Sequence, residues 1–263
     1  MLPVFLVTVR GIFRDRVFYG ILMTSVIFFF IPSISSLSMR QVTELSVTLS
    51  LSLISFILLL LSVFLGATAI WKDIERRYSY SVVGLPLSRT GYVIGKFAGV
   101  AGFILLTSLV LGLGACAVVW FTSGMYPPLR PVVWSTLLLA IAYDALKYVL
   151  LVAVSFLLST VSTSFFLPVF GTISTFLVGN ASQQVYDFVN SPAAANLSPF
   201  VKQAASILYY ILPNFSAFDL KVNAIYGITV STQGLLLTLA YCAVYICIVL
   251  SVSSLIFSRR ELQ

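Results

Sequence analysis

The chain has no histidine among its 263 residues, and only 9% of its residues are charged. Histidine is the usual general base and the commonest metal ligand, so its absence excludes HExxH metal sites and Ser–His catalytic pairs. The three cysteines lie inside apolar stretches without CxxC spacing, which argues against a zinc site or a disulfide framework. No GxxxxGK[ST] phosphate loop occurs either. We therefore expect no catalytic, metal or nucleotide site in this chain.

Long apolar runs dominate what is present. Hydrophobic residues make up 60% of the sequence, and the mean hydropathy is +1.07. A membrane-spanning helix needs roughly 20 mainly apolar residues, and several such runs follow one another. The net charge of +7 comes from basic residues at the ends of these runs, a placement that sets membrane orientation and argues against nucleic-acid binding. The sequence predicts an all-α integral membrane protein with a single transmembrane domain over residues 1–263.

Six stretches are predicted to cross the membrane. Two other segments are not: the N-terminal residues 1–16, and residues 181–224 between the fifth and sixth spans. Residues 1–16 place apolar residues at three- and four-residue steps between arginines, which is typical of an amphipathic helix in the membrane interface; an irregular extension of the first span is the alternative. Residues 181–224 are too polar to span, and Ser198 with Pro199 predicts the start of a short helix there. The predicted spans are residues 17–37, 45–70, 92–121, 132–160, 165–180 and 229–257.

Basic residues predict the orientation of these spans, because cytoplasmic loops are richer in lysine and arginine. With six spans, one side holds ten basic residues near span ends and the other holds four. The richer side contains both termini and residues 71–91, so these are expected in the cytoplasm and residues 181–224 outside. We expect a multi-pass protein of the cytoplasmic (inner) membrane, in contact with lipids.

The densest group of charges lies between the second and third predicted spans, in WKDIERRYSYSVVGLPLSRTGYVIGKFAG, residues 71–99. Residues 73–83 can form a short helix along the membrane, which Gly84 and Pro86 would end. Asp73 and Arg77, four residues apart, could pair on its solvent face. The alternative is a solvated loop whose charges only enforce topology.

Two further features lie inside predicted spans. Asp144 and Lys147 are three residues apart near the middle of the fourth span, so they can share a face and pair. Such a pair could line a substrate path or a contact between subunits, or it could be a satisfied structural pair. In the third span, a GxxxGxxxG pattern would let another helix approach closely. Its members are Gly91, Gly95 and Gly99.

The string IERRYSYSVVGLPLSRTGYVIGKFAG resembles the cytoplasmic loop of ABC-2-type ABC transporter permeases. An interfacial N-terminal helix, six spans and an apolar ending followed by two arginines agree with that family. The string ILPNFSAFDLK, residues 211–221, is similar to the subgroup described as multi-copper-enzyme-maturation permeases. The positions that match the family's loop are Leu85, Pro86, Ser88, Arg89, Gly95 and Lys96.

The resemblance implies the permease subunit of an ATP-driven exporter. It would pair with a second copy and with separate cytoplasmic ABC ATPase subunits, which would hold the ATP and Mg; this chain would hold no cofactor. The copper label is not carried over to chemistry, because without histidine and with scattered methionines there is no cluster of copper ligands. The residues implied in ATPase coupling are Asp73, Glu75, Arg76, Arg77, Tyr78, Leu85, Pro86, Ser88 and Arg89.

Two other functions stay open at this point. One is transmission of ATPase motion to an external accessory protein through residues 181–224, without transport. The other is an ion-coupled secondary transporter, which would favour more intramembrane carboxylates than Asp144 and repeated halves with broken helices. The sequence does not indicate a substrate.

Overall fold

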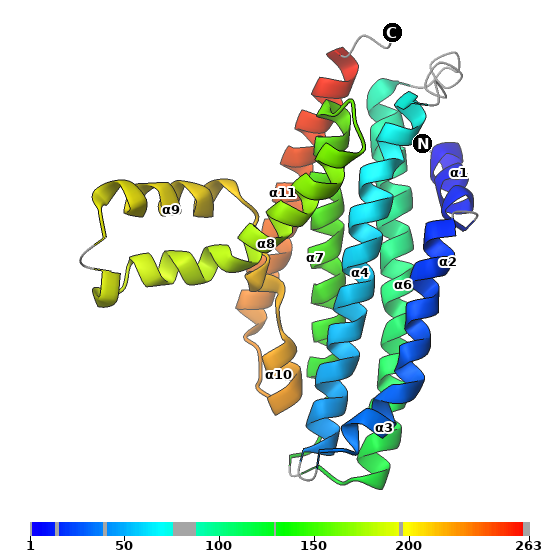
Figure 1. Ribbon diagram of the computed structural model, residues 1–263, viewed down its shortest axis with the longest axis vertical. Helices are drawn as coiled ribbons and strands as arrows, with labels where there is room; N and C mark the ends of the chain where they lie inside the picture. The colour runs from blue at the N-terminus through cyan, green and yellow to red at the C-terminus, as the bar shows by residue number, and fades with distance from the viewer. Residues whose placement is uncertain are drawn as a thin grey trace.

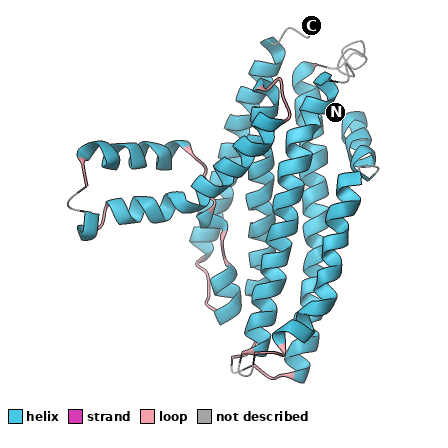
Figure 2. Ribbon diagram, in the orientation of Figure 1, coloured by secondary structure: helices cyan, strands magenta, loops and turns pink. Residues whose placement is uncertain are grey.

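All regular structure in the described part of the chain is helical (Figure 2). The computed structural model describes residues 2–13, 16–38, 41–75, 88–128, 130–194 and 197–259. Its main body is an elongated bundle of roughly parallel helices, from which a helical arm projects sideways (Figure 1). The predicted all-α class is therefore confirmed for the described residues.

Four helices are long and apolar enough to cross a membrane. The shortest of them has 28 residues, about 42 Å at 1.5 Å per residue, which exceeds the roughly 30 Å hydrocarbon core. They match the second, third, fourth and sixth predicted spans. These helices are α4 (Val42–Glu75), α6 (Arg89–Met125), α7 (Trp134–Val161) and α11 (Thr232–Arg259).

Helix α7 lies at the centre of the bundle and packs most closely against α4. Small residues form the seam between the two helices. A Cβ atom added to Gly66 would lie 2.8 Å from the Ser155 side chain, and the Ser62 hydroxyl of α4 donates to the Tyr148 carbonyl of α7 at 3.3 Å. Since apolar side chains gain little from leaving lipid, close packing through small residues is what holds such helices together.

The N-terminal helix α1 (Leu2–Phe13) forms within the predicted interfacial segment 1–16 and packs against α6. A Cβ atom added to Gly99 would lie 2.8 Å from the Cβ atom of Thr8. The Phe13 ring meets the edge of Phe103 at 5.4 Å between centroids. The helix is thus attached to the bundle, and its position in the membrane interface stays a prediction.

The first predicted span, residues 17–37, is divided into three short helices: α2 (Arg16–Thr24), η1 (Ser25–Phe30) and α3 (Ile31–Ser35). They follow one another along the bundle beside α4 and α6 (Figure 1). Pro32 stands in the first turn of α3, where its missing N–H costs nothing. No uninterrupted helix crosses here, and the crossing itself stays a prediction.

The fifth predicted span was expected to end at residue 180, but α8 (Phe166–Val189) continues for nine more residues. Its first half crosses α7, and its second half leaves the bundle (Figure 1). After η2 (Pro192–Ala194), α9 (Pro199–Ile211) returns alongside. The predicted start of α9 is confirmed, since Ser198 Oγ accepts from the Val201 N–H. We call residues 180–211 the arm.

The chain returns to the bundle through η3 (Ser216–Phe218) and α10 (Lys221–Tyr226) before entering α11. Gly227 ends α10 in the left-handed region, with φ of 65°, which glycine adopts without a steric cost. Helix α1, the end of α4, the start of α6 and the end of α11 all lie at the same end of the bundle (Figure 1).

Candidate functional site

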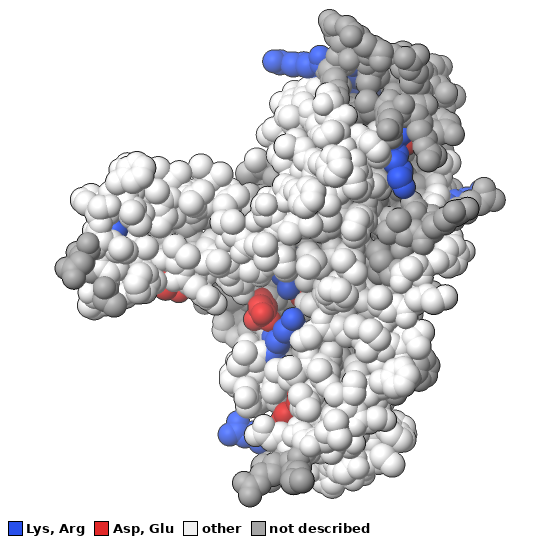
Figure 3. Space-filling view, in the orientation of Figure 1, with Lys and Arg blue, Asp and Glu red and all other residues white. Residues whose placement is uncertain are grey.

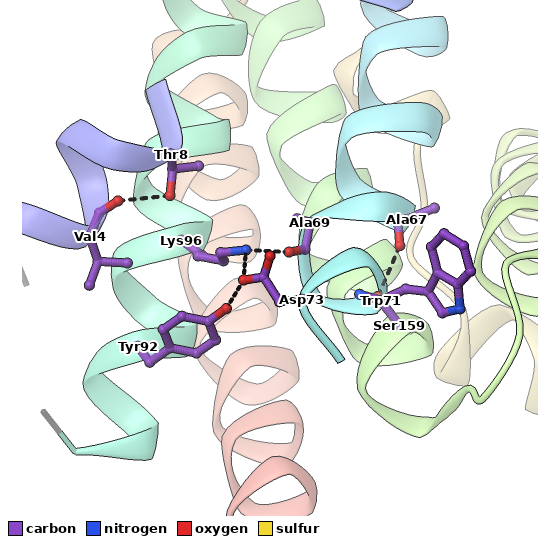
Figure 4. Close-up of polar contacts among 9 residues, drawn as sticks. All are labelled: Val4, Thr8, Ala67, Ala69, Trp71, Asp73, Tyr92, Lys96 and Ser159. Carbon is purple, nitrogen blue, oxygen red and sulfur yellow. Dashed lines mark hydrogen bonds and ion pairs between the residues drawn. The ribbon is translucent and has the colours of Figure 1, made fainter. Parts of the chain in front are cut away.

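A group of three polar side chains joins the end of α4 to the start of α6 (Figure 4). Asp73 Oδ2 forms an ion pair with Lys96 Nζ and accepts a hydrogen bond from the Tyr92 hydroxyl. The same lysine donates to the Ala69 carbonyl at 2.5 Å. We call Asp73, Tyr92 and Lys96 the latch, because they connect the two helix ends that flank residues 76–87.

The latch is largely shielded from solvent. The side chain of Lys96 is 13% exposed and that of Asp73 is 21% exposed. Lys96 Nζ also lies 5.4 Å from the centre of the Tyr92 ring, a cation–π distance. Partly buried charges are unfavourable unless paired and hydrogen-bonded, so these contacts favour one arrangement of the two helix ends over arrangements in which they separate.

The latch is also connected to the other two long helices. The Tyr92 ring stacks on Phe257 of α11, with centroids 5.8 Å apart. Arg89 Nη1 donates to the Ser258 carbonyl at 2.9 Å. On the other side of α4, the Trp71 N–H donates to Ser159 Oγ of α7 at 3.0 Å. The end of α4 is therefore bonded directly to α6 and α7, and through Tyr92 and Arg89 of α6 it is connected to α11.

The prediction that a separate helix begins at Asp73 was wrong, whereas the predicted pair of Asp73 with Arg77 lies outside the described residues. We expected a separate helix over residues 73–83 with Asp73 facing solvent beside Arg77, but α4 is unbroken as far as Glu75. Asp73 points toward α6 and pairs with Lys96, 23 residues away. The remainder of the predicted helix lies outside the described residues, as do five of the predicted coupling residues: Arg76, Arg77, Tyr78, Leu85 and Pro86.

The end of the segment is described again from Ser88. Its side-chain oxygen accepts from the Gly91 N–H at 3.1 Å, so Ser88 is the N-cap of α6. Arg89, the first residue of α6, reaches α11 as described above. The three glycines predicted to form a packing face are buried, and Gly99 is the one that meets Thr8 of α1.

Sequence reasoning missed Tyr92 altogether and gave Lys96 no partner. A signal was available, because Tyr92 and Lys96 are four residues apart and therefore share a face of α6. What was missing was the continuation of α4 past the apolar run, which brings Asp73 to the same depth as that face.

A second polar group lies in the interior of the bundle, where α4 meets α7. Lys147 Nζ is 2.5 Å from Asp144 Oδ1, and both side chains are less than a tenth exposed. The Ser55 hydroxyl of α4 lies within hydrogen-bond distance of both Asp144 oxygens, at 2.9 and 2.8 Å. Lys147 Nζ also lies 4.7 Å from the centre of the Tyr148 ring. These charges are thus paired and hydrogen-bonded inside one chain.

Neither polar group resembles a metal centre. Within the described ranges, no three Cys, Asp or Glu side chains gather closely enough to hold a metal ion. No family model and no curated protein matches the sequence. The function of the chain must therefore be inferred from the latch, from the buried pair of Asp144 and Lys147, and from the family resemblance of residues 71–99.

Proposed function

We propose that the chain is the membrane-spanning permease subunit of an ABC-2-type, ATP-driven exporter. It works with a second copy and with separate cytoplasmic ATPase subunits, which bind ATP and Mg and dock on residues 73–89. The observation that carries this proposal is the latch. The charged segment connects two long helices whose ends are joined to each other and to the rest of the bundle.

The latch gives a mechanical reason for this role. A subunit that docks on residues 76–87 holds the chain between the last turn of α4 and the first turn of α6. Because Asp73 and Lys96 hold these helix ends together, closure of the docked subunit would move both helices as a unit instead of separating them. The contact of Arg89 with α11 extends the movement to the end of the chain.

The topology that belongs to this function has six crossings with both termini in the cytoplasm. The excess of basic residues near the ends that hold α1, the polar segment and the end of α11 supports this orientation. Two crossings are then irregular. The first runs through α2, η1 and α3, and the fifth runs through the first half of α8 and, after the arm, through η3 and α10.

Purification in a mild detergent from the cells that make the protein tests the proposal. We expect a companion polypeptide to co-purify, and its sequence should contain a GxxxxGK[ST] phosphate loop. Mass spectrometry identifies it, and ATP hydrolysis by the purified complex checks its activity. Transport by the chain alone in vesicles, driven by an ion gradient without any nucleotide-binding companion, would contradict the proposal and favour a secondary transporter.

A further inference from the structure

The two helices of the arm face each other through polar and aromatic groups. The rings of Tyr186 and Tyr209 stack with centroids 4.2 Å apart, and the Tyr209 hydroxyl donates to Gln183 Oε1 of α8 at 3.0 Å. The side of α9 that carries Tyr209 is therefore its inner side. The opposite side of α9 is open to whatever surrounds the arm.

The outer side of α9 is an apolar strip. At about 100° per residue, Phe200, Ile207 and Ile211 each lie roughly 160–180° around the helix from Tyr209. Their side chains are 80%, 50% and 65% exposed. Ala204 lies on the same side, about 140° from Tyr209. We call Phe200, Ala204, Ile207 and Ile211 the α9 strip.

The charges of the arm lie away from this strip. Residues 180–211 contain one acidic and one basic residue, Asp187 and Lys202. Lys202 is partly buried and lies about 160° around α9 from Phe200, so it is on the side toward α8. Asp187 is exposed on α8, as are Gln184 and Phe188. The α9 side of the arm is thus apolar, whereas the α8 side is mixed and carries a carboxylate.

The α9 strip points toward the latch end of the bundle. In Figure 1 the arm projects sideways, and α9 lies on the side of α8 that is nearer the end of α11. The strip faces the same way, because it lies on the side of α9 away from α8. Figure 3, in the same orientation, shows acidic atoms on the lower edge of the arm and an uncharged upper edge over the described residues.

This direction has a consequence for a segment outside the cell membrane. The proposed topology places the latch end in the cytoplasm and residues 181–224 outside, so the membrane lies on the latch side of the arm. The α9 strip then faces the membrane, and the side of α8 that carries Asp187 faces the external water.

The α9 strip also continues an apolar surface of the bundle. At the end of α9, the Tyr245 hydroxyl of α11 donates to the Ile211 carbonyl at 3.0 Å. Ile248 and Val252 lie within about 60° of Tyr245 around α11, in the direction of the latch end, and both are exposed. Helix α11 is the least enclosed of the four long helices. The strip and the exposed side of this spanning helix therefore meet at the base of the arm.

We propose that the arm lies along the outer surface of the membrane, with the α9 strip among lipid acyl chains and the Asp187 side of α8 in the external water. Lipid fits this surface because the strip is uncharged and adjoins the exposed side of α11. Three tyrosines of the arm, Tyr186, Tyr209 and Tyr210, are of the type that favours the boundary between lipid and water. This inference rests on the topology of the proposed function.

A fluorescent label on each side of the arm tests what surrounds it. The variants Ile207→Cys and, as the matched control, Gln184→Cys are made with the three native cysteines replaced by alanine. Each is labelled with a nitrobenzoxadiazole dye, and the full chain is reconstituted in phosphatidylcholine vesicles. The quenchers are a lipid with a doxyl group on its acyl chain and iodide on both sides of the membrane.

We expect the doxyl lipid to quench the label at position 207 at least about threefold more strongly than that at position 184, because only the former meets acyl chains. Iodide should show the reverse order. Strong iodide quenching of both labels would place the arm in water. Protection of position 207 from both quenchers would place it against protein, and equal quenching of both labels by the lipid would place the whole arm inside the bilayer. Each of these three results overturns the proposal.

Trypsin added to the outside of intact cells gives a result that does not depend on a label. Lys202 is the only basic residue of the arm, and cleavage there requires α9 to leave the lipid. Replacing Phe200 and Ile207 together by glutamate should speed this cleavage at least about tenfold, because carboxylates disfavour contact with acyl chains. Gln184→Glu, the matched control, should not change it. No acceleration at Lys202 relative to Lys221, or an equal one in the control, contradicts the proposal.

The two proposals fail in different ways. If a nucleotide-binding companion co-purifies while position 207 is open to iodide or covered by protein, the lipid contact is wrong and the proposed function stands. If the doxyl lipid quenches position 207 as expected but no companion co-purifies, the lipid contact stands and the proposed function is wrong.

Discussion

Replacing Asp144 by leucine is expected to destabilise the folded chain by about 3–5 kcal/mol, the usual cost of leaving one member of a buried ion pair without its partner. Lys147 would keep its charge in a place where less than a tenth of the side chain reaches solvent. The Ser55 hydroxyl would lose its acceptor as well. Thermal or denaturant unfolding of the detergent-solubilised protein measures the effect.

The control for this prediction is the double replacement of Asp144 by leucine and Lys147 by methionine. Apolar residues of similar volume often replace a buried pair without loss of stability, so the double variant should recover most of what the single variant loses. Such non-additivity is the signature of two residues in direct contact. If Asp144→Leu unfolds like the wild type, the pair contributes no stability and a role in a substrate path gains weight.

Replacing Lys96 by methionine is expected to uncouple the chain from its ATPase. Without the lysine, Asp73 loses its ion pair and the ends of α4 and α6 lose their main polar connection. If the coupling free energy between the docked ATPase and the membrane helices falls by about 1.4 kcal/mol, the effect of either on the other falls about tenfold. We therefore expect the chain's stimulation of the companion's ATP hydrolysis to fall at least tenfold, while the companion still binds.

Tyr92→Phe separates this effect from a general loss of folding. That variant keeps the ring that stacks on Phe257 and removes only the hydroxyl that donates to Asp73. Its effect on coupling should be clearly smaller than that of Lys96→Met, at equal thermal stability. Full coupling in the Lys96→Met complex would show that the latch does not transmit movement.

The four long helices could be predicted from the sequence because an apolar run of more than 20 residues has few alternatives to a membrane-spanning helix. Their ends could not, because polar residues at the ends find partners in other helices. Lys72 and Asp73 read as the start of a loop, yet α4 continues through them to Glu75. The sequence also gave no sign that Asp73 would pair with Lys96 on α6, because that contact depends on how the two helices pack.

The ends of the first and fifth predicted spans could not be predicted from the sequence for the same reason. The fifth span was predicted to end at residue 180, where polar residues begin. Helix α8 continues beyond it because the side chains of these polar residues are hydrogen-bonded. Asn180 donates to the carbonyl of Phe176 in the preceding turn, and Gln183 accepts from Asn214 of the returning chain. The division of residues 17–37 into three short helices likewise followed no apolar pattern, although Pro32 stands where α3 begins. In contrast, Ser88 and Ser198 were predictable as N-caps, because capping depends only on local sequence.

The central claim is that a separate ATPase docks on the charged segment between α4 and α6, and charge reversal in that segment tests it most directly. Glu75, Arg76 and Arg77 are reversed together, and the companion that co-purifies is quantified with its ATP hydrolysis. The control reverses Glu44, in the first turn of α4, and Arg130, in the connection from α6 to α7, both at the other end of these helices. We predict that the first variant inserts normally but loses the companion and its coupled ATP hydrolysis, while the control retains both. Retention of the companion in the first variant, or its loss only in the control, would contradict the claim.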